Sequence, residues 1–326
     1  MKRRLLLAGA LLAPCTRAAI QAPQVQRQTR ALMGTQVRLV VPGAADELRP
    51  ALDAAWAEMA RLERLYSRFR ADSLVGNLAR QAGAAPLAMP PLMRELLALG
   101  RGLAQRSQGA FDATVGAYRD WHFEASKGRA PEVPDRQRLA AQRALVNWRD
   151  IEVDGGRVRL ARAGMRLDLG ALAKLPILEA GMQQLRQHGV QDALIDGGGD
   201  LLAIGRLHGR PWRVGIRDPR EPESLLAQLP LQDRWLVSSG DYERCFVHEG
   251  RRYHHVLDPR SGLPSQGLRG VSLIGRDWRE LAGLGTALMV TGAGAWSALR
   301  TPGVEGLWVD ERQVGRSRGF DEALRG

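Results

Sequence analysis

A pair of histidines ahead of an acidic turn is the segment best suited to acid–base chemistry. His254 and His255 are followed by Asp258, and Pro259 and Gly262 indicate a turn there. Neighbouring residues of a strand point to opposite faces, so only one of the two histidines can serve a given site. Imidazole titrates near neutral pH, and a carboxylate beside it can support a general base. The segment therefore predicts a histidine base with Asp258 beside it, although a lone histidine is usually structural.

Residues 109–116 place Phe111, Asp112 and Thr114 between two glycines. Small residues let backbone N–H groups approach a ligand while Phe111 packs on its ring. The alternative is the end of a helix entering a strand, with Asp112 as a capping residue. The residues alone leave both interpretations open.

Asp168 stands between two leucines at the start of an expected helix that carries Lys174. As a cap, Asp168 would accept hydrogen bonds from the first turn of that helix. A helix N-terminus is also a natural site for a phosphate, and Lys174 could reach the same anion.

Three glycines separate Asp196 from Asp200, directly after an apolar stretch. They indicate a tight turn with close backbone approach, or a plain hairpin turn. They do not match the GxGxxG fingerprint and no helix is expected after them, so a Rossmann dinucleotide site is excluded.

The elements that must position these residues follow from apolar spacing. Steps of three and four predict helices over about 52–69, 92–103, 171–188 and 281–291. A hairpin is expected over 151–160, around Asp154-Gly155-Gly156. Strands are expected over 35–41, 193–195, 201–204, 212–216, 235–238, 245–248, 253–257 and 271–274, a last hairpin around 307–309, and a surface loop over 124–138. No linker divides the chain of 326 residues, which predicts one compact unit of helices and strands.

The charge and the residue composition exclude some classes of binding partner and some classes of fold. The formal charge of +12 favours anionic ligands, but the arginines are scattered and not interleaved with exposed aromatics, which argues against nucleic acid. No apolar run is long enough for a transmembrane helix. Two cysteines exclude a disulfide scaffold and a cysteine-rich zinc motif.

The first 18 residues are typical of an export signal. Lys2, Arg3 and Arg4 precede a short apolar run and small residues, which predicts cleavage after Ala18 and a mature chain of 19–326. The arginine pair permits either the Sec or the twin-arginine route. The structural alternative is a frayed N-terminal helix.

Taken in order, these motifs resemble the FAD:protein FMN transferases, the ApbE-type flavin transferases, from about residue 33 to about 299. The resemblance rests on Met33-Gly34-Thr35, Ser67, Ser73 and Asn77, the 109–114 segment, Trp121-His122-Phe123, Asp168 with Lys174, Gly198-Gly199-Asp200, the 239–244 segment, and the 255–264 segment. Each motif is weak alone, but the ordered set is specific.

The resemblance implies an α+β fold, with antiparallel and mixed sheets packed by helices in a single compact catalytic unit. It implies a periplasmic protein, with inner-membrane association left open, that binds FAD and Mg²⁺. Such an enzyme cleaves FAD and attaches FMN to a Thr or Ser of an acceptor protein in a membrane or periplasmic redox complex. By matched position, FAD would contact Met33, Ala110, Phe111, Asp112, Asp168, Lys174, Asp241 and Val256, the metal would bind the Ala171 carbonyl and Thr286, and His255 would be the base with Asp258.

Departures from the family pattern cluster at the metal. The family's Ala-Asp-Ala-x-x-Thr-Ala motif has Ala282 in place of its aspartate, while Thr286 is kept. Leu175 and Pro176 stand where a Gly-Tyr pair usually follows the lysine. Two hypotheses therefore remain: a working transferase with weakened Mg²⁺ binding, or a non-catalytic FAD-binding protein that serves a periplasmic redox partner.

Overall fold

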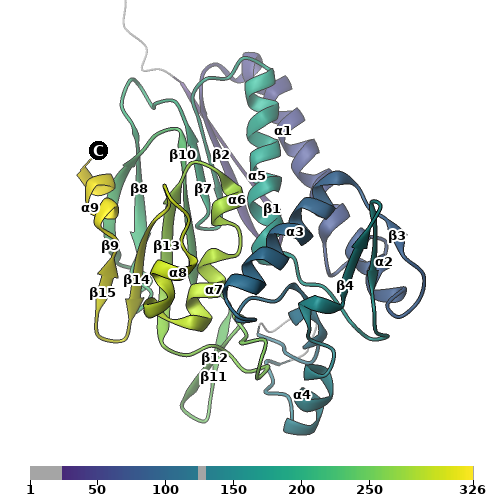
Figure 1. The fold of residues 1–326 in the computed structure, drawn as a ribbon. Coiled ribbons are helices and arrows are strands. Elements are labelled where there is room, and N and C mark those ends of the chain that lie inside the picture. The colour runs from purple at the N-terminus through teal and green to yellow at the C-terminus, as the bar shows by residue number, and fades with distance from the viewer. Residues whose placement is uncertain (1–23, 124–129, 326) are drawn as a thin grey trace, which may run out of the picture.

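An eight-stranded antiparallel sheet runs through the centre of the computed structural model, which describes residues 24–123 and 130–325 (Figure 1). Its strand order is β1-β2-β6-β7-β10-β13-β14-β15. The bounds are β1 Val25–Leu32, β2 Thr35–Pro42, β6 Ala193–Gly197, β7 Leu201–Ile204, β10 Arg234–Gly240, β13 Leu268–Gly275, β14 Glu305–Asp310 and β15 Val314–Arg316. The expected signal peptide, residues 1–18, lies outside the described residues.

Helices cover one face of this sheet and share one hydrophobic cluster with it (Figure 1). They are α1 Ala45–Tyr66, α2 Leu74–Arg80, α3 Pro91–Arg106, α5 Gly170–Gln187, α6 Trp278–Leu281, α7 Leu284–Thr291 and α8 Trp296–Leu299. In α1, the apolar side chains of Leu52, Trp56 and Met59 are buried because their spacing puts them on one stripe of the helix. This layer carries α5, whose first turn contributes to the site.

The opposite face packs on the hairpin of β8 Trp212–Arg217 and β9 Leu225–Leu231 and on α9 Arg318–Arg325. β8 alternates buried and exposed residues along its length, as a strand with one solvated face does. A second apolar cluster, which includes Trp212, Leu236 and Phe320, fills the space between these elements and the sheet.

Two smaller sheets lie outside these layers. One has the order β3-β5-β4, formed by β3 Leu87–Ala88, β4 Ile151–Asp154 and β5 Arg157–Leu160. The other is the hairpin of β11 Cys245–His248 and β12 Arg251–His254, which projects downward from the body near α4 Arg136–Arg143 (Figure 1).

The predicted α+β fold with antiparallel sheets in a single compact unit is confirmed. Every strand pair in the described residues is antiparallel, so no parallel pair makes these sheets mixed. Within the same residues, no helix is both long and apolar enough to cross a membrane.

The single helix expected over 281–291 is wrong, because the chain breaks at Ala282 and Gly283. α6 ends with Ala282 as its C-cap, at ψ 121°, and Gly283 at φ +75° precedes α7. A left-handed φ is accessible to glycine at little cost, so the sequence permits the break that apolar spacing hides. Ala282 and Thr286 therefore do not share one continuous helix.

Elements without a strong apolar pattern were not expected from the sequence. They are β1, β3, β9, α2, α4, α8 and α9, and α4 begins inside the expected 124–138 loop. β1 is largely exposed and lies at the sheet edge, so period-two burial is weak there. Pro176, which the sequence placed at a first turn or a kink, lies in the interior of α5 and is buried.

Candidate active site

His255 lies directly after β12 and its Nδ1 atom is buried with no hydrogen-bond partner among the described residues. Burial lowers the pKa of His255 to about 3, and the positive charge of Arg244 adds to the effect. The imidazole is therefore neutral near pH 7 and has an acceptor nitrogen to offer. This is the protonation state that a general base needs.

The two histidines face different groups, as strand alternation predicts. His254 Nε2 lies 2.9 Å from the carbonyl oxygen of Ser265, and His254 is almost fully buried. Burial lowers its pKa as well, and the nearby charges belong to Asp241, Arg252 and Arg269. The carboxylate that acts on His255 is Asp168, and the cation with the largest effect on it is Arg244. His255 is therefore associated with the start of α5, and His254 with Asp241.

Asp168 is the carboxylate that acts on His255. Its Oδ2 accepts a 2.7 Å hydrogen bond from Arg68 Nη1, and its Oδ1 accepts from the Gly170 amide at 2.8 Å. Burial alone would raise the pKa of Asp168, but Arg68, the Gly170 amide and Arg244 outweigh burial and lower it. Asp168 is thus an anion held between arginines at the start of α5.

Lys174 lies one turn further along α5 and is paired rather than free. Its Nζ is 2.6 Å from Asp200 Oδ2 and 3.3 Å from the Gly197 carbonyl oxygen. Asp200 Oδ1 also accepts from the Ser238 amide at 3.1 Å. The lysine of the predicted anion site is therefore bound to the carboxylate of Asp200. A phosphate would have to displace that carboxylate to bind Lys174.

The glycines between Asp196 and Asp200 form the β6–β7 hairpin turn. Gly198 and Gly199 have φ of +72° and +92°, and both amides donate to Asp196 Oδ1 at 3.0 Å. These two amides are already satisfied, so the structure favours the hairpin interpretation over a phosphate cradle here.

In the 109–116 segment, the expected capping role of Asp112 is confirmed, but a 3₁₀ helix follows it where a strand was expected. Asp112 caps a short 3₁₀ helix, Ala113–Ala117, and accepts hydrogen bonds from the Thr114 amide and hydroxyl and from the Trp148 amide. Burial raises the pKa of Asp112 in spite of these bonds. Phe111 is only 4% exposed and packs in the main core, and Ala110 is fully buried. The idea that the Phe111 ring packs on a ligand ring is thus corrected.

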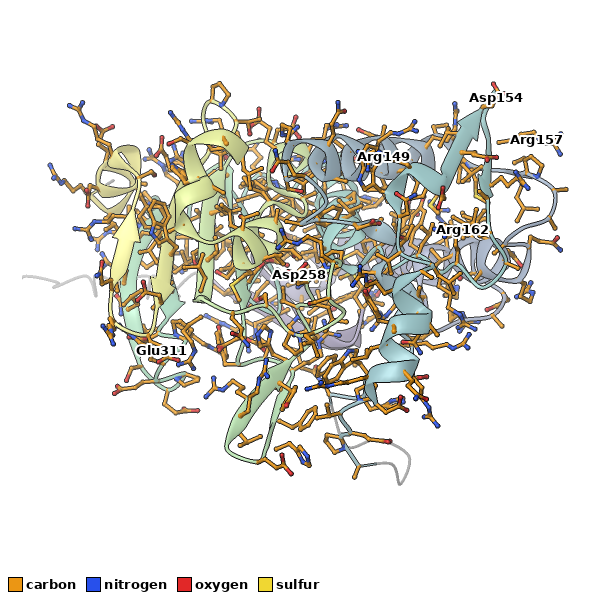
Figure 2. All side chains as sticks on the ribbon, turned by 60° about the horizontal axis from the view of Figure 1, so that its bottom comes forward. Arg149, Asp154, Arg157, Arg162, Asp258 and Glu311 are labelled. Atoms are coloured by element: carbon orange, nitrogen blue, oxygen red, sulfur yellow. The ribbon has the colours of Figure 1, made fainter. Side chains whose placement is uncertain are left out.

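Asp241 and Asp258 are both committed to arginines. Asp241 Oδ2 accepts from Arg269 Nε at 2.6 Å, and Arg252 Nη1 lies 3.4 Å from both of its oxygens. Asp258, labelled in Figure 2, accepts from the backbone amide and the guanidinium of Arg260. The carboxylate that acts on His255 is therefore Asp168 and not the expected Asp258. Asp241 links β12 to β13 through Arg252 and Arg269.

The loop that follows His255 is fastened to the 113–121 segment. The Tyr118 hydroxyl donates to the Pro259 carbonyl at 2.8 Å, and Trp121 Nε1 donates to the Gly262 carbonyl at 2.7 Å. Val256 is buried in the main core, and its carbonyl accepts from the Ser265 amide. These contacts fix the position of His255 from both sides of the turn.

Met33 forms the β1–β2 turn with Gly34. Its φ of +54° is unusual for a residue with a side chain, and Gly34 follows at +72°. Such a pair closes a two-residue hairpin of the type I′ kind. Met33 is half-buried against the main core, so part of its side chain remains available to a ligand.

The proposed metal positions carry few oxygen ligands. Ala171 lies in the first turn of α5, and Thr286 is half-buried in the first turn of α7. Across residues 24–123 and 130–325, no group of three or more His, Cys, Asp or Glu side chains could hold a metal ion. The residues present do not fit a magnesium site built from protein carboxylates.

Phe69 is a site candidate that the sequence did not single out. Its ring is 77% exposed, beside Arg68, whose guanidinium lies 4.7 Å from the ring centroid. An exposed aromatic face can pack on a planar ligand ring. The apolar spacing places Phe69 at the end of the expected 52–69 helix, but α1 ends at Tyr66 and leaves Phe69 beyond it.

Together these residues define an α+β protein with a neutral, buried histidine beside a cationic end of α5. Arg68, Arg244 and Lys174 supply positive charge there, and Asp168 and Asp200 balance part of it. Such a site can attract a phosphate-bearing substrate and accept a proton.

Known proteins share this architecture. The model of the ApbE family matches residues 33–308. An FAD:protein FMN transferase of Treponema pallidum is 32% identical, with 93% of this chain and 90% of that protein covered. The crystal structure of the ApbE protein of Thermotoga maritima superimposes with a TM-score of 0.84 at 28% identity, over 93% of this chain and 100% of that one. The apo flavinyl transferase ApbE of Pseudomonas stutzeri gives a TM-score of 0.79 at 29% identity, over 93% and 98%.

The chain therefore belongs to the ApbE family, and the expected membership is confirmed. The family match ends at residue 308, inside β14, so β15 and α9 lie beyond it.

Proposed function

We propose that this protein is an FAD:protein FMN transferase. The observation that carries the proposal is the neutral His255, which has a buried, unpartnered Nδ1 and lies within the electrostatic reach of Arg244 and Asp168, in a chain of the ApbE family. The relatives that carry this activity in their names match this chain along most of its length. They support an active transferase over the non-catalytic alternative.

In the proposed reaction, a Ser or Thr hydroxyl of the acceptor protein attacks the phosphorus on the FMN side of the FAD pyrophosphate. A new phosphoester bond forms, the bond to the bridging oxygen breaks, and AMP leaves. The hydroxyl proton passes to His255. Arg68, Arg244 and Lys174 offset the negative charge on the pyrophosphate, which is the main demand of phosphoryl transfer.

Phe69 extends the proposed site toward the flavin. Its exposed ring lies next to Arg68, so a flavin ring can pack on it while the pyrophosphate stays near the arginines. This places the flavin contact after α1 and leaves Phe111 in the core.

Magnesium is part of the proposal only as an ion that arrives with the substrate. The protein has no carboxylate at position 282, and Asp168 and Asp200 are paired with Arg68 and Lys174. Magnesium is often held by substrate phosphates together with one or two carboxylates. With Thr286 and the Ala171 carbonyl as the remaining protein ligands, magnesium binding should be weak.

A direct assay tests the proposed function. Purified protein, FAD and Mg²⁺ are incubated with a peptide that contains an acceptor threonine, and covalent flavin fluorescence is read after denaturation. Fluorescence on the peptide with release of AMP supports the transferase. Bound FAD with no labelled peptide over a wide range of Mg²⁺ would favour the non-catalytic FAD-binding alternative.

The protein should bind FAD more tightly than FMN or riboflavin. The candidate contacts run from Phe69 through Arg68 and Asp168 to Lys174, and the cations suit a pyrophosphate that riboflavin lacks. Quenching of flavin fluorescence in a titration measures the three affinities. Equal affinity for riboflavin and FAD would contradict the assignment of the cationic residues to the pyrophosphate.

We also propose that the protein is exported and acts on an acceptor protein of a membrane or periplasmic redox complex. The support is the basic and apolar pattern of the first 18 residues and the redox use of covalently bound flavin. Expression of the full chain in a bacterial host should give a periplasmic product beginning at residue 19, as read by N-terminal sequencing. A product in the cytoplasm with its first 18 residues intact would contradict export.

A further inference from the structure

The β11–β12 hairpin is closed by two residues with left-handed backbones, Glu249 at φ +49° and Gly250 at φ +73°. His248 pairs with Arg251 next to the turn, and Val247 pairs with Arg252 one step further away. In such a hairpin the pair beside the turn exchanges its hydrogen bonds, and the next pair directs its backbone N–H and C=O groups outward. Val247 therefore lies on the outer edge of β11 with its backbone groups facing away from β12.

One face of the hairpin is fixed by stacked aromatic rings. Phe246 and Tyr253 are cross-strand partners whose ring centroids lie 5.5 Å apart. Trp121 lies 5.8 Å from Tyr253, and Phe123 lies 6.2 Å from Phe246. A two-stranded hairpin alone is marginally stable, so this stack holds β11 and β12 in place as a platform.

Near the turn, the Val247 face of the hairpin and the outer edge of β11 are open, while the base of this face is covered at His254. Val247 is 67% exposed, far more than a valine in a covered strand. In the described ranges, β11 has β12 as its sole strand partner. An exposed strand edge with an apolar side chain is a template for the addition of another strand.

The base of this hairpin is continuous with the candidate active site. The Arg244 carbonyl accepts a hydrogen bond from the His255 amide at 3.1 Å, directly before β11 begins. A strand added to β11 would lie about 4.8 Å from it and would pass the end that carries Arg244 and His255. A residue of that strand can therefore be delivered to the histidine.

The charge of the hairpin selects the kind of segment. Residues 244–254 contain Arg244, Arg251 and Arg252 and a single acid, Glu249. The chain as a whole carries +12. Electrostatic complementarity favours an acidic segment and speeds its encounter with the protein.

We propose that the acceptor protein docks through an extended, acidic segment that pairs with the outer edge of β11 and places its Ser or Thr at His255. This inference rests on the proposed transferase function, and it names the surface and the chemistry of the partner. Val247 contacts an apolar side chain of the segment, and the excess positive charge of the hairpin attracts its acids.

The test uses a fluorescein-labelled peptide of twelve residues with a central threonine between alternating aspartates and valines. Its binding to the FAD-loaded protein is followed by anisotropy, and amide hydrogen exchange is measured over residues 245–248. Val247→Asp puts a carboxylate on the docking face. Val153→Asp is the matched control, because Val153 is a 42% exposed valine in the separate β4–β5 hairpin.

We expect Val247→Asp to weaken peptide binding by about tenfold or more, with FAD affinity unchanged. Val153→Asp should bind the peptide as the native protein does, and the peptide should slow exchange in β11. A peptide with lysines in place of aspartates should bind more weakly. Equal binding by the two variants, binding without slowed exchange in β11, or no binding of the acidic peptide would overturn the docking site.

The same peptide separates this inference from the proposed function. Slowed exchange in β11 without covalent FMN on the threonine would keep the docking site and count against the transferase. Covalent FMN with the same KM for the peptide in both variants would keep the transferase and remove the docking site.

Discussion

His255→Ala is expected to slow FMN transfer by roughly 10²–10⁴-fold, the usual cost of losing a general base. FAD affinity should change little, because the cations that suit the pyrophosphate are Arg68, Arg244 and Lys174. The measurement is the initial rate of covalent flavin formation, with FAD binding followed separately by flavin fluorescence.

His254→Ala is the control for this substitution. His254 faces the Ser265 carbonyl and the Asp241 cluster, so its loss should affect stability more than turnover. Thermal unfolding of each variant separates the two effects. Equal losses of turnover in two equally stable variants would show that His255 is not the base.

The pH dependence of the transfer kinetics should report the titration of His255. In the free protein, burial and Arg244 lower its pKa to about 3, so it stays neutral from pH 8 to pH 5. A bound pyrophosphate adds negative charge nearby and raises that pKa, which brings the base closer to the optimum for proton transfer. The parameter kcat reports the pKa of His255 in the FAD complex, and kcat/KM reports its pKa in the free protein. We therefore expect the loss of kcat in acid to occur at a higher pH than the loss of kcat/KM.

The same shift makes His255 destabilising in acid. Between its unfolded pKa of about 6.5 and its folded pKa, the unfolded chain binds a proton that the folded chain does not. Stability is therefore lost as pH falls from about 6.5 toward 3. His255→Asn removes this titration, so the pH dependence of the free energy of unfolding should be weaker in that window.

Ala282→Asp is expected to create the carboxylate that a magnesium site here lacks. Residue 282 is 6% exposed and precedes Gly283, the N-cap of α7, whose first turn carries Thr286. Without metal, a buried carboxylate there should destabilise the fold by at least about 1–3 kcal/mol. With Mg²⁺, the concentration needed for half-maximal transfer should fall by about 10–100-fold.

Ala282→Asn is the matched control, because it has the same shape without the charge. Thermal unfolding with and without Mg²⁺ gives a readout that does not depend on catalysis, since a bound ion stabilises the folded state. Both variants responding alike to Mg²⁺, with curves that superimpose on the native one, would show that position 282 is not at the metal.

Local spacing alone determined much of this protein. The three- and four-residue steps of Leu52, Trp56 and Met59 predicted α1, and the Asp154-Gly155-Gly156 turn predicted the β4–β5 hairpin. The opposite directions of His254 and His255 also followed from the sequence, because alternation along a strand is a property of the backbone. The ordered motifs predicted the family, which the comparisons confirm.

Only the tertiary structure decided which groups each aspartate side chain bonds to. Asp112 and Asp241 are occupied by internal hydrogen bonds and arginines, and the carboxylate that acts on His255 is Asp168 rather than Asp258. Spacing predicts which way a side chain points, but a contact between distant segments depends on the order in which strands and helices pack. The sheet order and the anchoring of the 256–264 loop by Tyr118 and Trp121 bring these segments together, and no local pattern encodes either.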